Sequence, residues 1–212
     1  MKNIKIRNPI LNKTELIEST VKKSNIINLN KVILNEIILD NEIFEEIKIN
    51  ESILKNISFQ SSKIEEIKIT DSFINQINFA GTILNQTYLE RSVIENSRFQ
   101  GTQFMDCVMN DLVIKKTKCT GLSLRYSIIK NVIFISCDLE NADFLGANLK
   151  NVAFISCNLK NSQFSQAKLK NIDFKKSEIV GISLEKDSFK NITVNTGQAI
   201  YLASAMGLNI ED

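Results

Sequence analysis

The chain contains no histidine among its 212 residues. Histidine is the usual general base at neutral pH and the commonest protein ligand for metal ions. The short motifs of hydrolases, P-loop proteins and dinucleotide-binding proteins are absent as well. Adjacent carboxylates occur at Glu45–Glu46 and Glu65–Glu66, and a solvated surface explains them more simply than catalysis does. These absences predict a protein that is not an enzyme and has no catalytic residue, no metal site and no cofactor.

Proline and glycine are also scarce, with one and seven residues respectively. This leaves no candidate linker and favours a single domain. No apolar run approaches the roughly 18 to 20 residues of a membrane-spanning helix. Residues 1–9 are basic but lack the apolar core of a signal peptide. We therefore expect a soluble, cytoplasmic protein without a membrane contact, and the Ile-, Asn- and Lys-rich composition suggests an AT-rich, bacterial genome.

What the chain does contain is an apolar residue at every fifth position. The series runs without a break from Leu29 to Val194, over 34 positions, and Cys119 is its weakest member. Helices repeat at about 3.6 residues and strands at about 2, so a period of five indicates a larger repeating unit. We call each of these positions a centre. The residue two before each centre is mostly small or β-branched, although Glu42 and Asp187 interrupt this second pattern.

Two inward positions per five residues can line only a narrow tube. Four five-residue sides make a square coil of 20 residues, so residues 20 apart should stack through β-ladder hydrogen bonds. Phenylalanines obey this spacing in three sets: Phe59, Phe79 and Phe99; Phe134, Phe154 and Phe174; Phe144 and Phe164. A solenoid of this kind buries its core only by stacking neighbouring coils, and it needs capped ends.

Segments such as Ala142–Gly146, Ala147–Asn151 and Ser162–Gln166 resemble the A(D/N)LXX motif of pentapeptide-repeat proteins. The resemblance covers about four-fifths of the chain. It implies an all-β fold, the right-handed quadrilateral β-helix of that family, with about eight coils here. In the amino-terminal half, the position two before the centre is often Ile or Val, which predicts distorted or widened coils there.

The two ends leave the repeat. We expect residues 1–28 to form a lead-in and cap, with Leu11, Leu16, Ile17 and Val21 spaced for one side of a short helix. Residues 29–195 form the β-helix, and residues 196–212 form a helix and tail. Thr196 is the predicted N-cap of that helix and Gly207 its left-handed C-terminal stop, with Leu208 as the apolar partner.

The carboxy-terminal helix has more apolar surface than one capping face requires. Related pentapeptide-repeat proteins dimerise tail to tail through such a helix, so the resemblance implies a homodimer. A simple cap on a monomer is the alternative. The expected dimer contacts are Ile200, Tyr201, Leu202, Ala203 and Met206.

All four cysteines fall at inward positions of the repeat: Cys107, Cys119, Cys137 and Cys157. Cys137 and Cys157 are 20 apart and should stack, so a disulfide between them is geometrically allowed. The simpler interpretation is that they are small buried side chains that stay reduced in a cytosol. The spacing of a zinc site is absent.

Function in such a rod should lie in columns of outward residues, and three columns stand out. An apolar stripe consists of Ile33, Ile53, Phe73, Val93, Val113, Ile133, Ile135 and Ile155. An acidic face consists of Glu45, Glu46, Glu65, Glu66 and Asp106. A basic column consists of Lys130, Lys150, Lys170 and Lys190. An exposed apolar stripe is typical of a contact surface, whereas β-branched residues packing against one another on strands are the alternative.

Charge is divided unevenly along the rod. Residues 36–111 contain 13 acidic and 6 basic side chains, and residues 112–194 contain 7 acidic and 13 basic side chains. The lysine column could meet an anionic partner or instead serve solubility. Without interleaved aromatic residues it is weak evidence for nucleic-acid binding.

Three functions remain open. The first is a non-enzymatic rod or scaffold that binds an unidentified protein. The second follows from a resemblance in size and layout to the quinolone-resistance group of pentapeptide-repeat proteins (Qnr and MfpA), which implies duplex-DNA mimicry on DNA gyrase. The net charge of +2 and the absence of projecting loops depart from that pattern. Direct binding to nucleic acid is the third.

Overall fold

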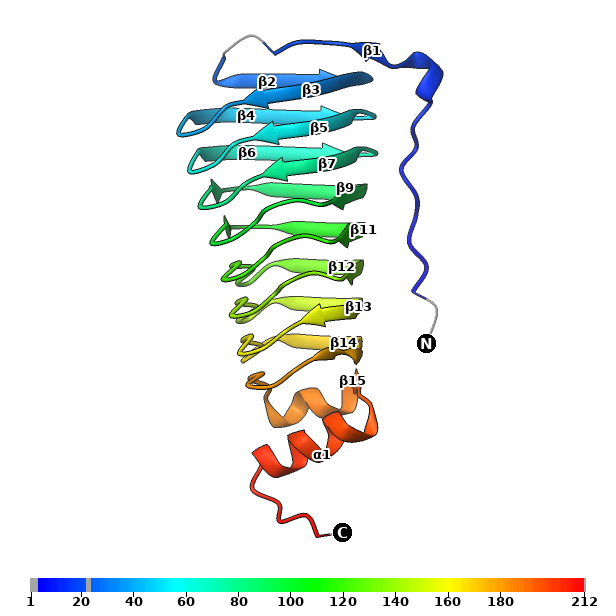
Figure 1. The fold of residues 1–212 in the computed structure, drawn as a ribbon, viewed down its shortest axis with the longest axis vertical. Coiled ribbons are helices and arrows are strands. Elements are labelled where there is room, and N and C mark those ends of the chain that lie inside the picture. The colour runs from blue at the N-terminus through cyan, green and yellow to red at the C-terminus, as the bar shows by residue number, and fades with distance from the viewer. Residues whose placement is uncertain (1–3, 22–23, 212) are drawn as a thin grey trace.

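The rod is a single parallel β-solenoid of about eight coils that ends in one α-helix (Figure 1). The computed structural model describes residues 4–21 and 24–211. The strands within these residues are β1 Ile17–Glu18, β2 Ile26–Asn30, β3 Val32–Ile38, β4 Ile43–Asn50, β5 Ile53–Ser58, β6 Lys63–Thr70, β7 Phe73–Asn78, β8 Ile83–Leu84, β9 Thr87–Glu95, β10 Gln103–Phe104, β11 Val108–Lys115, β12 Ile128–Ile135, β13 Asn148–Asn158, β14 Lys168–Glu178 and β15 Ile192–Thr193. The helices are the 3₁₀ turns η1 Lys13–Glu15 and η2 Lys186–Asn191, and α1 Thr196–Ala205.

Strand pairing follows the 20-residue step that the sequence predicts. Strands β2, β4 and β6 form one ladder, and β3, β5 and β7 form a second. Strand β9 pairs with both β6 and β7, and β11 to β15 continue the stack beyond it. The register joins, for example, Phe134 to Phe154 and Lys130 to Lys150. The coils therefore place residues of one type directly above one another.

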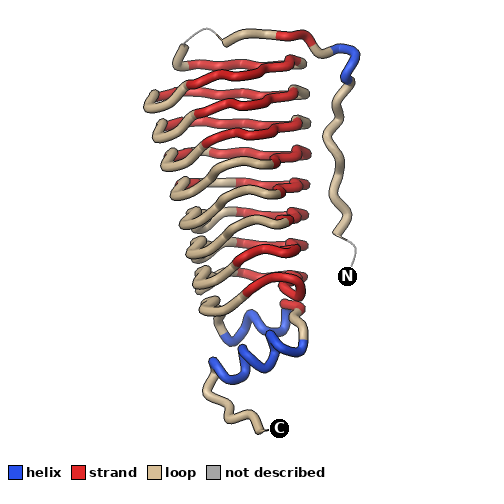
Figure 2. Tube along the Cα trace, viewed as in Figure 1, coloured by secondary structure: helices blue, strands red, loops and turns tan. Residues whose placement is uncertain are grey.

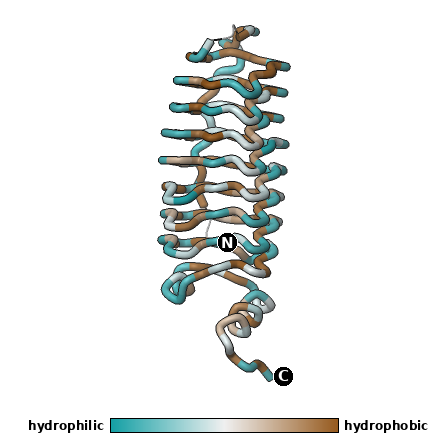
Figure 3. Tube along the Cα trace, turned by 90° about the vertical axis from the view of Figure 1, so that its left-hand side faces the viewer, coloured by the Kyte–Doolittle hydropathy of each residue, from teal (hydrophilic) through white to brown (hydrophobic). Residues whose placement is uncertain are grey.

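The core is the interior of the coils, and the predicted phenylalanine ladders are confirmed. Ring centroids of Phe134 and Phe154 lie 5.2 Å apart with planes 9° from parallel, and Phe154 and Phe174 lie 5.4 Å apart. Phe59, Phe79 and Phe99 stack in the same way, as do Phe144 and Phe164. Offset stacking at this spacing adds aromatic contact to the burial of apolar area. Hydrophobic and hydrophilic residues alternate along every coil (Figure 3).

Most corners of the coils are turned by residues two after a centre that have a positive φ. Asn, Asp and Gly tolerate this left-handed conformation best, which explains the abundance of Asn at these positions. Gly146 illustrates a second constraint, because a Cβ atom on it would lie 2.4 Å from the ring of Tyr126. Glu46 and Glu66 are exceptions, since they lie inside the continuous strands β4 and β6. The amino-terminal coils thus lack the left-handed residue at one corner. In Figure 1 the coils narrow toward the carboxy-terminal end.

The cysteines are buried and unbonded. Burial raises the pKa of the Cys107 and Cys119 thiols, which keeps them in the unreactive neutral form. Of the two residues that interrupt the inward pattern, Glu42 is half-buried, whereas Asp187 is exposed in η2, a 3₁₀ turn that replaces a strand on that side of the last coil.

The structure corrects two details of the ends. Residues 11–21 do not form the expected short helix, because the only helical turn among them is η1 and the chain is otherwise extended, with β1 paired to β3. This amino-terminal arm then runs along the side of the rod (Figure 2). Helix α1 is capped by Asn195 rather than by Thr196, through a capping box with Gln198.

The other end of α1 follows the prediction. Gly207 has a φ of +88°. Its N–H donates to Ser204 and the N–H of Leu208 donates to Ala203, which together make a Schellman motif.

Candidate interaction surfaces

Six of the eight residues of the apolar stripe form one continuous column on the outer side of the face that β3, β5, β7, β9, β11 and β12 share. Each member pairs in register with the next, as Ile33 with Ile53, Ile53 with Phe73, Phe73 with Val93, Val93 with Val113, and Val113 with Ile133. Ile135 pairs with Ile155 in the adjacent column. Phe73 is the most exposed member at 36%, and a shallow depression of about 220 Å³ surrounds it.

The stripe has a defined end. Ala153 follows Ile133 in register and is buried, and Asp173 follows Ala153. The column thus changes from apolar to charged within two coils. The structure therefore brings the predicted residues together on one face over about six coils.

Two residues of the acidic face, Glu46 and Glu65, are paired with neighbouring lysines. Glu46 and Glu66 stack in register on β4 and β6. Lys48 Nζ lies 2.5 Å from Glu46 Oε1, and Lys63 Nζ lies 2.6 Å from Glu65 Oε1. Opposite charges at these distances cancel at long range, so this face is less negative than its glutamates suggest.

The acidic face also includes Glu65, Glu45 and Asp106. Hydrogen bonds from Lys63 and then Asn85 lower the pKa of Glu65 below its ordinary value. Glu45 and Asp106 are exposed, and Asp106 lies two coils beyond Glu66 on the same corner. The predicted face is therefore discontinuous.

The basic column contains three lysines in register instead of the predicted four. Lys130, Lys150 and Lys170 are paired residues of β12, β13 and β14 and are exposed. Lys190 lies in η2, outside that ladder, 3.9 Å from Asp187. Beside the column, Asn131, Asn151 and Asn171 bond to one another through their amides.

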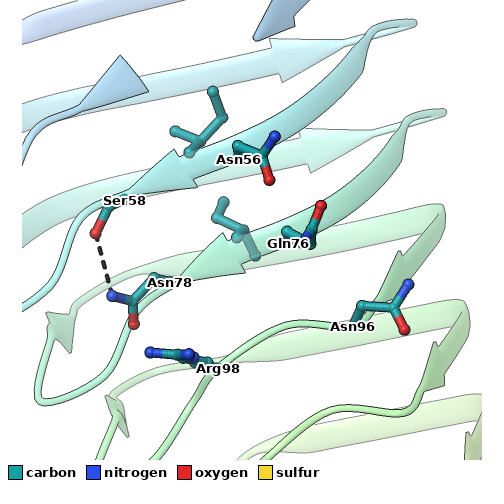
Figure 4. A pocket seen from close by; sticks show the side chains of 8 residues that line it. Asn56, Ser58, Gln76, Asn78, Asn96 and Arg98 are labelled. Carbon is teal, nitrogen blue, oxygen red and sulfur yellow. Dashed lines mark hydrogen bonds between the residues drawn. The ribbon is translucent and has the colours of Figure 1, made fainter. Parts of the chain in front are cut away.

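A polar depression of about 220 Å³ lies beside the face with the apolar stripe. Figure 4 shows its amide side chains, with Asn56, Gln76 and Asn96 on three successive corners. Asn78 Nδ2 donates to Ser58 Oγ at 3.1 Å across the next face. Asn96 Nδ2 likewise donates within the rod, to Asn75 Oδ1 at 3.0 Å.

Only part of the predicted dimer surface is free, because α1 packs its inner side on the last coils. Leu202 is buried against the core, and Tyr201 Oη accepts a hydrogen bond from the Gly181 N–H at 2.6 Å. The expectation that Leu202 faces a partner is therefore wrong, since the helix needs this residue to cap its own rod. Ile200 and Met206 are exposed. Ala203 is half-buried.

A cluster that the sequence did not reveal lies on the corner next to the basic column. We call Asp71, Glu90, Arg91 and Asp111 the arm site. Arg91 donates to both carboxylate oxygens of Asp71, at 2.8 and 2.6 Å, and its Nη1 lies 2.7 Å from Glu90. Asp111 is 2% exposed and accepts a hydrogen bond from Asn131 at 3.2 Å. The rod thus holds three carboxylates and one guanidinium on neighbouring coils, with the guanidinium paired to Asp71 and Glu90.

The amino-terminal arm, residues 4–16, places a second guanidinium in this site. Arg7 Nε donates to Asp111 Oδ2 at 2.6 Å, and Arg7 Nη2 donates to Glu90 Oε1 at 2.7 Å. The Ile10 N–H donates to Asp71 at 2.9 Å. The repeat pattern does not predict this site, because Arg7 lies outside the repeat. One sequence feature could have indicated the site: the corner that later coils form with asparagine has Asp71, Arg91 and Asp111 here.

The pKa values reflect this pairing. Burial acts to raise the pKa of Asp71, but hydrogen bonds from Arg91 and the Ile10 N–H leave it below its ordinary value. The pKa of Glu90 is likewise lowered against the effect of burial, by Tyr88, Arg91 and Arg7. The hydrogen bond to Asp111 is the largest cause of the raised pKa of Arg7. Asp71, Glu90 and Arg7 are therefore ionised at neutral pH.

Two family profiles match the repeat region. "Pentapeptide repeats (8 copies)" matches residues 75–111, and "Pentapeptide repeat region" matches residues 115–184, which together are about half of the chain. The chain belongs to the pentapeptide-repeat family. Proteins of this family are generally non-enzymatic structural or interaction proteins. No curated protein matches the sequence.

Solved pentapeptide-repeat structures resemble this one in fold. A trypsin-treated variant of QnrB1, a plasmid-mediated fluoroquinolone resistance protein, is 17% identical and has a TM-score of 0.40, covering 84% of this chain and 100% of its own. HetL from the cyanobacterium Nostoc sp. strain PCC 7120, a protein involved in heterocyst differentiation regulation, is 13% identical with a TM-score of 0.29, over 74% of this chain and 87% of its own.

Within the described residues of this pentapeptide-repeat protein, no three His, Cys, Asp or Glu side chains gather in a group that could hold a metal ion. None of the described helices is long and apolar enough to cross a membrane.

Proposed function

We propose that the protein is a non-enzymatic interaction rod that binds another protein through the apolar stripe. The observation that supports the proposal is the stripe itself, an in-register outward column of apolar side chains that includes the exposed Phe73. Contiguous apolar surface of this kind on a soluble protein marks contact sites, because its burial in a complex is favourable.

Ordinary strand composition explains the stripe less well. Other outward columns in the described coils keep apolar residues over three successive coils at most, as at Tyr88, Val108 and Ile128. If β-branched side chains were chosen only for packing on strands, every face should show long apolar columns. The restriction to one face favours a binding role.

Site-specific crosslinking tests this proposal. Phe73 is replaced by a photo-crosslinking amino acid in the producing cell, and Asn78 on the neighbouring face is replaced in a matched control. We expect a discrete adduct with one other protein from position 73 and none from position 78. Equal or absent crosslinking at both positions would contradict the stripe as the contact surface.

We further propose a homodimer formed by the outer side of α1 and the following tail. Ile200, Met206, Leu208 and Ile210 are all at least 46% exposed, which leaves an apolar surface at one end of the rod. Light scattering of the purified protein should give the mass of a dimer, and the variant Ile200→Lys with Met206→Lys should give a monomer. A wild-type monomer at all concentrations would rule the dimer out.

The ion pairs of the acidic half weigh against the gyrase alternative. Glu46, Glu65, Glu95 and Asp71 each have a basic partner within 2.6 Å, so the negative charge of residues 36–111 is interrupted by cations, unlike the unbroken charge of a DNA backbone. Gyrase supercoiling with purified protein, with and without a fluoroquinolone, separates the two functions. We expect no effect, and inhibition or drug protection at low micromolar protein would instead support topoisomerase binding.

A further inference from the structure

The arm site is preorganised by the rod and does not depend on the arm for its shape. Glu90 accepts hydrogen bonds from Tyr88 at 3.0 Å and from Asn110 at 3.3 Å. Asp111 heads the amide ladder that continues through Asn131 and Asn151. The carboxylates therefore keep their positions whether or not Arg7 is present.

Charge within the site is unbalanced without a second guanidinium. Asp71, Glu90 and Asp111 supply three negative charges, and Arg91 supplies one positive charge. Asp111 is almost completely buried, and a buried carboxylate without a cationic partner is strongly unfavourable. Arginine suits this position because its planar fork reaches two carboxylates at once, as Arg7 reaches Asp111 and Glu90.

The arm that fills the site is only lightly attached. Between Ile4 and Leu16, hydrogen bonds from the arm to the described coils come from Arg7 and Ile10, and Lys31 adds one side-chain bond from the rod to Glu15. The Arg7 side chain is 54% exposed and Ile10 is 68% exposed. Regular strand pairing with the rod begins only at β1. Since the attachment rests on so few contacts, a competing cation that pairs with the same carboxylates can take the place of the arm.

We propose that the arm site is a binding site for an arginine in an extended basic protein segment, and that residues 4–11 occupy it as an exchangeable intramolecular ligand. A segment from another molecule with the same chemistry competes with the arm. Its source is either the arm of a second copy of this chain or a basic tail of a different protein. The site lies on a different face from the apolar stripe and does not depend on the stripe's role.

A labelled peptide with the sequence of residues 4–16 tests the proposal by fluorescence anisotropy. The full-length variant Arg7→Glu vacates the site, because a carboxylate replaces the guanidinium beside Asp111 and Glu90. We expect the peptide to bind this variant at least about 10-fold more tightly than it binds wild type, where the tethered arm competes at an effective concentration on the order of millimolar.

The matched control is the double variant Arg7→Glu with Asp111→Asn. Asparagine fits this corner, since Asn131, Asn151 and Asn171 occupy it on the next coils with the same left-handed φ. The rod should keep its fold and melting temperature, while peptide affinity should fall by about 10-fold or more. Equal affinity of the peptide for Arg7→Glu protein with and without Asp111→Asn would overturn the site, as would the absence of binding to both.

A second peptide with lysine in place of Arg7 tests the preference for arginine. Lysine is a point charge that cannot form the two-carboxylate fork, so we expect several-fold weaker binding. Equal binding would overturn the assignment to arginine.

Mixing two full-length variants separates the sources. Arg7→Glu keeps the site without its ligand, and Asp111→Arg keeps the ligand without its site. Both variants also carry Ile200→Lys and Met206→Lys, which remove the proposed α1 dimer, so mixed dimers that form in this pair when neither variant dimerises alone identify a second copy as the source. Peptide binding without mixed dimers identifies a tail of another protein.

Discussion

The two halves of the rod repeat the same five-residue unit but fill the core in different ways. In residues 112–194, the ladder of Phe134, Phe154 and Phe174 meets Phe144 and Phe164 edge to face, at centroid distances of 5.7 to 6.2 Å. In residues 29–111, the ladder of Phe59, Phe79 and Phe99 meets other rings only at its ends, Phe44 at 5.6 Å and Phe104 at 6.0 Å, and is otherwise surrounded by isoleucine and leucine. The repeat therefore specifies positions, and each half satisfies them with its own side chains.

The amino-terminal half also uses buried hydroxyls as part of its backbone structure. Val32, Ser52 and Ser72 each donate their backbone N–H to the hydroxyl of the serine 20 residues later, the last being Ser92. In the other half, that column is Leu112, Val132, Val152 and Ile172. The first half thus depends on a polar ladder and the second on apolar packing, so substitutions should affect them unequally.

The largest effect is expected where the aromatic stack is interrupted by charge. Phe154→Asp places a carboxylate between Phe134 and Phe174, where no partner is available, and should unfold the rod cooperatively. Circular dichroism melting measures this. Ile155→Asp, at the half-buried neighbouring position, is the control and should leave most of the stability intact. An unchanged melting temperature for Phe154→Asp would show that the register is wrong.

A smaller contrast is expected between the two phenylalanine ladders. Phe154 touches four rings and Phe79 touches two. Phe154→Ala should therefore lower the free energy of unfolding by about 4 to 5 kcal/mol and Phe79→Ala by about 3 to 4 kcal/mol. Urea unfolding of both variants gives the comparison. The reverse order would mean that the aromatic stack does not distinguish the halves.

The contacts that the sequence predicts are those that the repeat determines. The stacking of Phe134 on Phe154 and of Phe73 on Val93 is predictable, because one 20-residue step fixes both core and surface columns. Arg7 could not be placed, since no local pattern says where a non-repeating segment docks. The sequence also does not predict which side of α1 packs on the rod and buries Leu202, because apolar residues nearly surround the helix.

Removing a hydroxyl from the serine ladder should lower the free energy of unfolding by about 1 kcal/mol more than removing a serine hydroxyl in the other half. Ser72→Ala removes the hydroxyl that accepts from the Ser52 N–H and donates to Thr70, and should cost about 1 to 2 kcal/mol. Ser162→Ala is the matched control in the other half, where the hydroxyl only donates to Leu159, and should cost about 0.5 to 1 kcal/mol. Equal losses in urea unfolding would argue against a structural role for the ladder.

The smallest contrast concerns pH. The folded-state pKa values of Asp71 and Glu90 lie below their ordinary values of 3.8 and 4.5, so their contribution to stability is complete above about pH 4.5 and is lost as the pH falls through the folded values. Solvent screening limits this to about 1 kcal/mol or less. Hydrogen exchange should show the arm opening near pH 3 while the coils around Phe154 stay protected. An arm equally protected at pH 3 and pH 7 would contradict the role of these ion pairs.

The most direct measurement of whether the apolar stripe serves binding rather than packing is thermal melting of the double variant Phe73→Thr with Val93→Thr. Threonine keeps a high strand preference but removes the apolar surface. If the stripe exists for a partner, the purified variant should melt within about 4 °C of wild type, since about 1 kcal/mol corresponds to 2 to 4 °C at this size. A fall of more than about 8 °C would show that the stripe stabilises the rod itself.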